Sequence, residues 1–202
     1  MRDLSFDPQT RQLRTRRLVL RPLQPGDAPA LLDIYRQPAV TQHYDLETMQ
    51  TLEQAQRMLD FFMQHHDRFA VLEAANARVL GTCGLFHWEP GSRMASLGYD
   101  LAPDAWGRGV MREAARAVLA YGFARLQLNR VNALSAVDNP ASARLLGALG
   151  FTEEALLRQF AWWKGAFHDM RMFALLRDDL AGNPIETLLP ALADAPDPVK
   201  TA

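Results

Sequence analysis

Residues Gly98–Ala114 read GYDLAPDAWGRGVMREA, and this stretch decides the fold. It starts with strand character, passes through a turn that carries Gly107 and Gly109, and opens a long helical pattern. Glycine lets the backbone adopt unusual angles and approach a ligand closely. A helix start presents unpaired N–H groups and a partial positive charge, which suit a phosphate or pyrophosphate. The stretch therefore predicts an anion site, with a turn that needs glycine for geometry alone as the alternative.

Two well-known phosphate loops do not fit this turn. A P-loop needs Gly-Lys-Ser/Thr at the helix start, whereas Gly109 is followed by Val110 and Met111. The dinucleotide fingerprint needs a third glycine three residues after Gly109, where Arg112 stands. Both nucleotide-binding interpretations are excluded.

Working outward from this turn, hydrophobic periodicity predicts strands and helices in the order β-α-α-β-β-β-α-β-α-β-β. The seven expected strands are Arg16–Leu23, Phe69–Glu73, Val79–Trp88, Met94–Leu101, Val131–Val137, Thr152–Trp163 and His168–Leu176. Helices are expected after Asp27, from Thr51 to about Asp67, after Gly109, and after Asn139. The predicted fold class is α+β (α/β layered), with a mixed, mostly antiparallel central sheet of about seven strands and helices on both faces.

Composition limits the classes of function. A chain of 202 residues with 49% hydrophobic residues predicts one folded domain. We divide it into an N-terminal arm (1–12), a folded domain (13–180) and a C-terminal appendage (181–202) for which no catalytic role is expected. The net charge of −1 provides no global attraction to nucleic acid, and the single Cys83 excludes a Cys-based zinc cluster. No segment suits a signal peptide or a membrane helix, so we expect a soluble, cytoplasmic protein.

A second motif lies downstream, where residues 139–151 read NPASARLLGALGF. With it, the sequence resembles the GCN5-related N-acetyltransferase (GNAT) family, and within it the branch that acetylates N-terminal amino groups of ribosomal proteins. The resemblance covers about Leu13–Leu180. It is carried by Leu97-Gly98-Tyr99, Trp106-Gly107-Arg108-Gly109 with Glu113-Ala114, Asn139 with Ser142, Gly150-Phe151, and Gly165 with His168-Asp169.

The resemblance implies an acyl-CoA N-acyltransferase fold and a coenzyme A site. No metal is expected, because the five histidines show no ligand spacing. The expected ligand is acetyl-CoA, the acetyl donor. Its pyrophosphate would bind main-chain N–H groups of Trp106, Gly107, Arg108, Gly109, Val110 and Met111. The pantetheine arm would lie along Tyr99, Asp100 and Leu101, where the strand splays from its neighbour at a bulge, and Asn139 and Ser142 would face the thioester.

The proton-transfer residues depart from the family's pattern. Ser96 stands where many relatives carry a glutamate base, and Leu146 stands where other branches carry a tyrosine acid. We therefore take Ser142 as the candidate that assists the departing thiolate, and His87 and Glu89 as candidate bases. A helix-start serine and a surface strand histidine are the structural alternatives for Ser142 and His87.

The expected function is acetyl transfer to a primary amine, such as the N-terminal amino group of a ribosomal protein. The alternatives are a small-molecule amine acetyltransferase and a non-catalytic acyl-CoA-binding module. Expected partners are acetyl-CoA and the amine, with neither membrane nor nucleic acid, and a homodimer is plausible.

Overall fold

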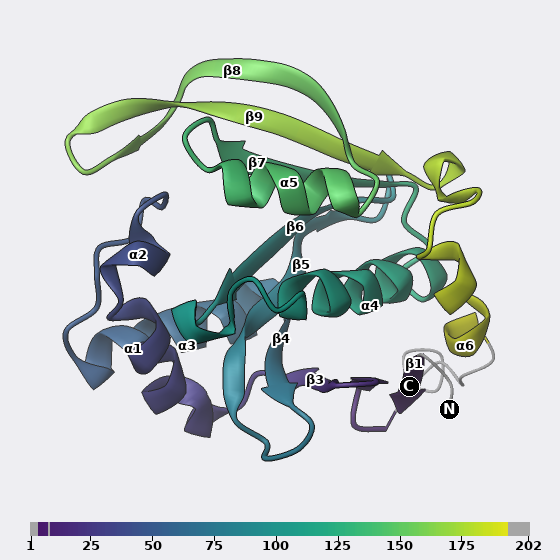
Figure 1. The fold of residues 1–202 in the computed structure, drawn as a ribbon, viewed down its shortest axis with the longest axis horizontal. Helices are drawn as coiled ribbons and strands as arrows, with labels where there is room; N and C mark the ends of the chain where they lie inside the picture. The colour runs from purple at the N-terminus through teal and green to yellow at the C-terminus, as the bar shows by residue number, and fades with distance from the viewer. Residues whose placement is uncertain (1–3, 8, 194–202) are drawn as a thin grey trace.

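The computed structural model describes residues 4–7 and 9–193. Within these ranges one nine-stranded sheet has the order β1-β2-β3-β4-β5-β6-β7-β9-β8 (Figure 1). The strands are β1 (Leu4–Asp7), β2 (Gln12–Thr15), β3 (Leu18–Pro22), β4 (His66–Glu73), β5 (Val79–Glu89), β6 (Met94–Leu101), β7 (Arg130–Ala136), β8 (Thr152–Trp163) and β9 (Ala166–Leu176). The helices are α1 (Ala28–Tyr35), α2 (Pro38–Thr41), α3 (Leu52–His65), α4 (Val110–Ala124), α5 (Pro140–Ala148) and α6 (Pro190–Ala193).

The mixed, mostly antiparallel sheet is confirmed. Among the described strands, β6 and β7 form the parallel pair and the other neighbours are antiparallel. The sheet has two more strands than the seven expected, because β1 and β2 precede the first of them. Each is only four residues long, which is too short for a clear alternation of apolar and polar residues.

Helices cover both faces of the sheet. Strand β4 shows why: Phe69 and Val71 belong to one apolar cluster, and Ala70 and Leu72 to another, because successive side chains of a strand point to opposite faces. The first cluster contains buried residues of α4, α5 and α6, and the second contains those of α1, α2 and α3. In Figure 1 the helices α1, α2 and α3 gather at the left, and α5 lies between α4 and the β8–β9 hairpin.

The two ends of the described chain meet. Helix α6 contacts both β1 and α4, and the side chains of Ile185 and Leu192 are fully buried in the larger apolar cluster. Residues 181–193 of the expected appendage therefore contribute to the core, while residues 194–202 lie outside the described residues. In the part of the chain that the structure describes, no helix combines the length and apolar character needed to cross a bilayer.

The sheet opens in its middle. Strands β6 and β7 pair only where Met94–Ser96 face Arg130–Asn132. Beyond that point β6 stays with β5 as far as Leu101, and β7 stays with β9 as far as Ala136. The expected splay along Tyr99–Leu101 is thus present and begins just after Ser96, so an opening lies between the two parallel strands. The bulge expected with it lies instead in β5, between Phe86 and Glu89.

Candidate active site

The glycine turn joins the end of β6 to α4. Gly107 and Gly109 both have φ of +71°, a backbone conformation that glycine adopts without steric cost. Gly109 immediately precedes α4 and offers no side-chain cap, so the first N–H groups of α4 have no partner within the helix. A Cβ built on Gly107 would have no atom within 4 Å. The turn is therefore an open cradle of backbone donors that suits a pyrophosphate.

Thr15 of β2 and Arg17, which lies between β2 and β3, hold this turn through side-chain hydrogen bonds. Arg17 donates through Nη1 to the carbonyl of Arg108 at 3.0 Å and through Nε to Glu113 at 2.7 Å. Thr15 donates its hydroxyl to the other oxygen of Glu113 at 2.6 Å. Burial would raise the pKa of Glu113, but the hydrogen bonds from Thr15 and Arg17 outweigh it and lower the pKa.

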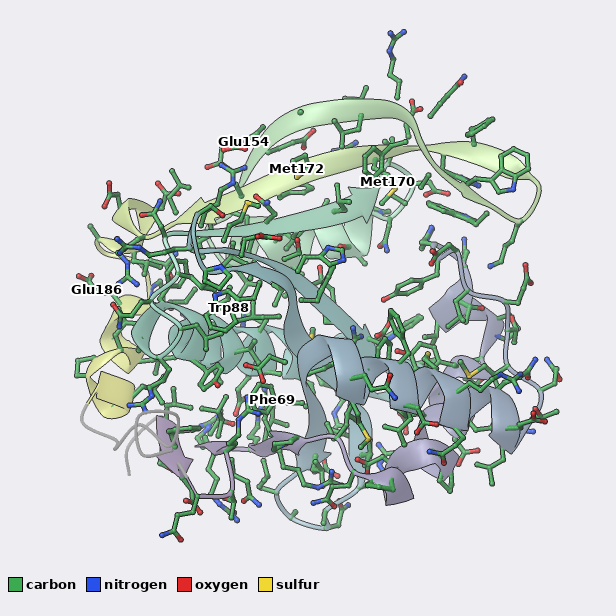
Figure 2. The ribbon with its side chains drawn as sticks, turned by 180° about the vertical axis from the view of Figure 1, so that it is seen from behind. Phe69, Trp88, Glu154, Met170, Met172 and Glu186 are labelled. Carbon is green, nitrogen blue, oxygen red and sulfur yellow. The ribbon has the colours of Figure 1, made fainter. Side chains whose placement is uncertain are left out.

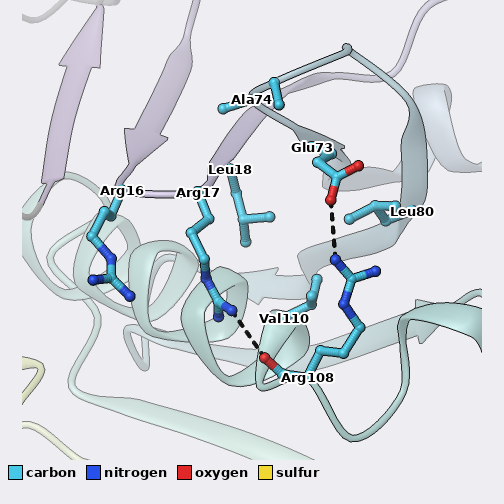
Figure 3. A pocket seen from close by; sticks show the side chains of 9 residues that line it. Arg16, Arg17, Leu18, Glu73, Ala74, Leu80, Arg108 and Val110 are labelled. Carbon is cyan, nitrogen blue, oxygen red and sulfur yellow. Dashed lines mark hydrogen bonds and ion pairs between the residues drawn. The ribbon is translucent and has the colours of Figure 1, made fainter.

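A cavity of about 440 Å³ lies beside the turn, between β3, the β4–β5 connection and the start of α4. Figure 3 shows the Arg108 side chain directed toward Glu73, with Arg17 at the Arg108 carbonyl. The Arg108 and Glu73 side chains pair at 3.1 Å. One nitrogen of the Arg108 guanidinium is thus engaged by Glu73, while the side chain stays half exposed beside the turn. The Trp106 ring is likewise used, because Nε1 donates to the carbonyl of Leu101 at 2.8 Å.

Asp100, expected beside the pantetheine arm, has its side chain inside the protein. Its carboxylate accepts hydrogen bonds from Tyr35 at 2.5 Å, from Thr82 at 3.3 Å, and from Arg68 and Tyr44. Burial and the negative charge of Asp100 raise the pKa values of Tyr35 and Tyr44 well above 10. Burial alone would lower the pKa of Arg68, but the negative charge of Asp100 outweighs burial, so the pKa of Arg68 is raised. Any contact of Asp100 with a coenzyme would therefore run through its backbone.

Tyr44 links the α2–α3 connection to the splayed strand. Besides its bond to Asp100, its hydroxyl donates to the carbonyl of Tyr99 at 2.9 Å. The α2–α3 connection thus reaches the open edge of β6 through Tyr44.

The start of α5 lies across the opening from β6. Asn139 caps the helix, because its side-chain oxygen accepts from the Ser142 N–H at 3.1 Å. The Ser142 hydroxyl shares a hydrogen bond of 2.8 Å with the hydroxyl of Tyr99. Burial raises the pKa of Tyr99 to about 12, so this hydroxyl keeps its proton at neutral pH. Tyr99, Asn139 and Ser142 therefore form one cluster, whereas Leu146 is buried in the core.

His87 and Glu89 lie elsewhere. A bulge interrupts β5 at this point, His87 has φ of +50°, and Glu89 pairs with Met94. Met94 is five residues before Tyr99, and at about 3.4 Å per residue this places Glu89 about 17 Å along the strand from the Tyr99–Ser142 pair. Figure 2 shows Trp88, next to His87, well apart from Met170, which pairs with Ala136 at the other end of β7. The structure does not bring His87 or Glu89 to Ser142.

One histidine that the sequence did not single out does reach the site. His43 follows α2, and its Nδ1 lies 3.1 Å from Oδ1 of Asp138, the residue just before Asn139. Its local sequence has no motif, and only the tertiary contact with Asp138 marks it.

Comparisons with known proteins agree with the family that the sequence resembles. The Acetyltransferase (GNAT) domain profile matches residues 17–152. The chain is 34% identical over 175 residues to the uncharacterized N-acetyltransferase p20 of Bacillus licheniformis, covering 84% of this chain and 98% of p20. It is 32% identical over 102 residues to YdaF of Bacillus subtilis (strain 168), whose name assigns it provisionally to the ribosomal N-acetyltransferases, covering 50% of this chain and 56% of YdaF.

A solved structure shares the fold. Spermidine N-acetyltransferase from Vibrio cholerae, in complex with CoA and spermine, superposes with a TM-score of 0.73 at 23% identity, covering 82% of this chain and 98% of that one. The open strand pair, the glycine turn at a helix start, the profile match and the full-length relative agree, and the chain belongs to the GNAT family of N-acetyltransferases.

Proposed function

We propose that this N-acetyltransferase, whose donor is acetyl-CoA, acts on the α-amino group of a peptide or protein N-terminus. The observation that carries the proposal is that β6 offers no available carboxylate between Ser96 and Leu101. Ser96 has no carboxylate, and the carboxylate of Asp100 accepts hydrogen bonds from Arg68 and two tyrosines. An α-amino group, with a reference pKa near 8, is partly neutral at pH 7, whereas a lysine amine near 10.4 is not.

In this proposal the coenzyme follows the opening in the sheet. Its pyrophosphate binds the N–H groups of Gly107–Met111, which the positive φ angles of Gly107 and Gly109 and the first turn of α4 support. The Trp106 N–H, which was expected to join them, donates to the Pro103 carbonyl at 3.1 Å. The pantetheine arm follows the backbone of Tyr99–Leu101 toward Asn139 and Ser142. The name of YdaF supports a terminal amine, and the spermine complex of the Vibrio cholerae enzyme makes a polyamine the second candidate.

At the thioester, Ser142 assists the departing thiolate. The amine attacks the carbonyl carbon, the C–S bond breaks with its electrons on sulfur, and a hydroxyl near that sulfur donates a proton. The structural support is that the Ser142 hydroxyl faces Tyr99 and does not cap α5, because Asn139 performs the capping.

The test is release of free coenzyme A from acetyl-CoA by the full chain with three acceptors. These are a hexapeptide with a free N-terminal serine, the same peptide with a blocked terminus and an internal lysine, and spermine. Turnover of the first alone supports the proposal. Turnover of spermine alone replaces it with a small-amine function, and binding of acetyl-CoA without turnover of any acceptor favours a binding module.

A further inference from the structure

His43 carries a buried polar atom without a hydrogen bond. Within residues 4–7 and 9–193, His43 Nδ1 is the buried side-chain nitrogen or oxygen that finds no hydrogen-bond partner. Asp138 Oδ1 lies 3.1 Å away, at the distance of an ion pair but outside hydrogen-bond geometry. Buried polar groups are nearly always satisfied, so an exception beside an active site calls for a functional explanation.

The pair spans the opening between β6 and β7. On one side, Tyr44 follows His43 and donates to the Tyr99 carbonyl at 2.9 Å. On the other side, Asn139 follows Asp138 and caps the helix that carries Ser142. The two chain neighbours of the pair thus contact the two residues that share the 2.8 Å hydroxyl–hydroxyl bond.

The end of α2, just before His43, is held in place from a third element. Lys164, at the tip of the β8–β9 hairpin, donates to the carbonyl of Thr41 at 2.6 Å. The His43 side chain is 19% exposed and that of Asp138 is 68% exposed. The imidazole is therefore largely buried with a part of its surface open, while the Asp138 side chain is mostly exposed.

We propose that His43 is the general base that takes a proton from the acceptor amine, and that Asp138 is a positioning residue for its ring. The inference rests on the proposed function and names the base which that function lacks. In a neutral imidazole one nitrogen donates and the other accepts. The negative charge of Asp138, 3.1 Å from Nδ1, favours the tautomer with the proton on Nδ1, and Nε2 then carries the lone pair that accepts a proton.

The proton balance is complete without a further reactant. His43 Nε2 takes one proton from the acceptor ammonium, and the freed lone pair forms the N–C bond to the thioester carbonyl carbon. The C–S bond breaks with its electron pair on sulfur. The thiolate gains a proton from the Tyr99–Ser142 pair, and the second proton that the nitrogen loses as the amide forms restores the proton of that pair. Coenzyme A leaves as the thiol, and one proton per turnover passes from His43 to solvent.

The experiment compares four variants with the wild type, using whichever of the hexapeptide and spermine turns over faster. They are His43→Ala, His43→Gln, Asp138→Asn, and the matched control Asp45→Asn, which makes the same carboxylate-to-amide change at an exposed position of the His43 segment. General base catalysis is typically worth about 100-fold or more. Both His43 variants should lose at least about 100-fold in kcat with the KM for acetyl-CoA changed by less than about twofold. Asp138→Asn should lose about tenfold, and the control should match the wild type.

Added imidazole separates a base from a structural bridge. Imidazole should restore at least a tenth of the lost kcat in His43→Ala, about tenfold above the unrescued variant, and leave the wild type unchanged. An unchanged kcat in the His43 variants overturns the inference. So does a loss that imidazole does not rescue and that comes with a lower melting temperature or a raised KM for acetyl-CoA. If the wild type itself acetylates neither the hexapeptide nor spermine, the proposed function is wrong, and the assignment of His43 as its base falls with it.

Discussion

The hydroxyls of Tyr99 and Ser142 lie 2.8 Å apart, although the two residues are 43 positions apart in the sequence. Tyr99 comes from β6 and Ser142 from the first turn of α5, on opposite sides of the opening in the sheet. Because burial raises the pKa of Tyr99 to about 12, the pair remains protonated under ordinary conditions. In the proposed mechanism the pair therefore acts as one hydrogen-bond-donating unit toward the departing thiolate.

We expect Ser142→Ala and Tyr99→Phe each to lower kcat by at least about tenfold, because general acid assistance is typically worth about 100-fold. The double variant should be little worse than the more severe single variant, since residues that act as a unit are not additive. Steady-state kinetics under conditions where chemistry limits the rate provide the measurement. Additive losses in the double variant would mean that the two hydroxyls act separately.

Gly107→Ala should weaken acetyl-CoA binding at least about tenfold, because the new methyl group enters the turn where the proposed pyrophosphate approaches the backbone. Gly182→Ala is the matched control. Gly182 has φ of +73°, against +71° for Gly107, and neither glycine has an atom within 4 Å of an added Cβ. Both substitutions should lower stability by a similar amount, on the order of 1 kcal/mol. Calorimetric titration that finds equal affinity in the two variants would refute the pyrophosphate assignment.

Asn139 has two separable roles. Asn139→Ala should lower the free energy of unfolding by about 1 kcal/mol, because the cap to the Ser142 N–H is lost. Asn139→Asp keeps an acceptor for that N–H and should leave the melting temperature unchanged. If the amide also contacts the coenzyme, Asn139→Asp raises the KM for acetyl-CoA. If the KM of Asn139→Asp for acetyl-CoA equals that of the wild type, the role of Asn139 is purely structural.

Glu113 makes stability depend on acid pH. Its pKa in the folded protein lies below the reference value of 4.5, because the bonds from Thr15 and Arg17 outweigh burial. A group with a lowered folded pKa stabilises the protein above its unfolded pKa, and this contribution is lost as pH falls through the folded pKa. Glu113→Gln should thus be less stable than the wild type at pH 7. Urea unfolding should show the difference shrinking below about pH 4.5, and a constant difference would contradict the linkage.

Asp100 holds a buried charge. Asp100→Ala should cost about 3–5 kcal/mol, since it leaves the guanidinium of Arg68 buried without a counter-charge. Arg68→Met combined with Asp100→Ala should recover part of that loss because no buried charge remains. Denaturant unfolding tests both, and a double variant as unstable as Asp100→Ala alone would show that the charge of Arg68 is not the cause.

Local signals were sufficient for most of the fold. The seven expected strands are present because each has at least five residues with a clear apolar pattern, and the turn before α4 is marked by Gly107 and Gly109. The sequence did not predict the β1–β2 hairpin, because its few apolar residues show no periodic pattern. Leu4 and Leu13 are recognised as core residues only from their packing in the larger apolar cluster.

The sequence by itself determined the glycine turn before α4, the family resemblance and the place of Ser142 at the start of α5, because these depend on residues a few positions apart. Only the tertiary structure decided which distant side chains meet. In the structure Tyr99 contacts Ser142, and His43 lies beside Asp138. The Asp100 carboxylate is buried against Arg68 and two tyrosines. His87 and Glu89 lie far from Ser142. The physical reason is that the splay of β6 from β7 fixes which elements face each other across the opening, and strand pairing over long sequence separations leaves no periodic signal in the chain.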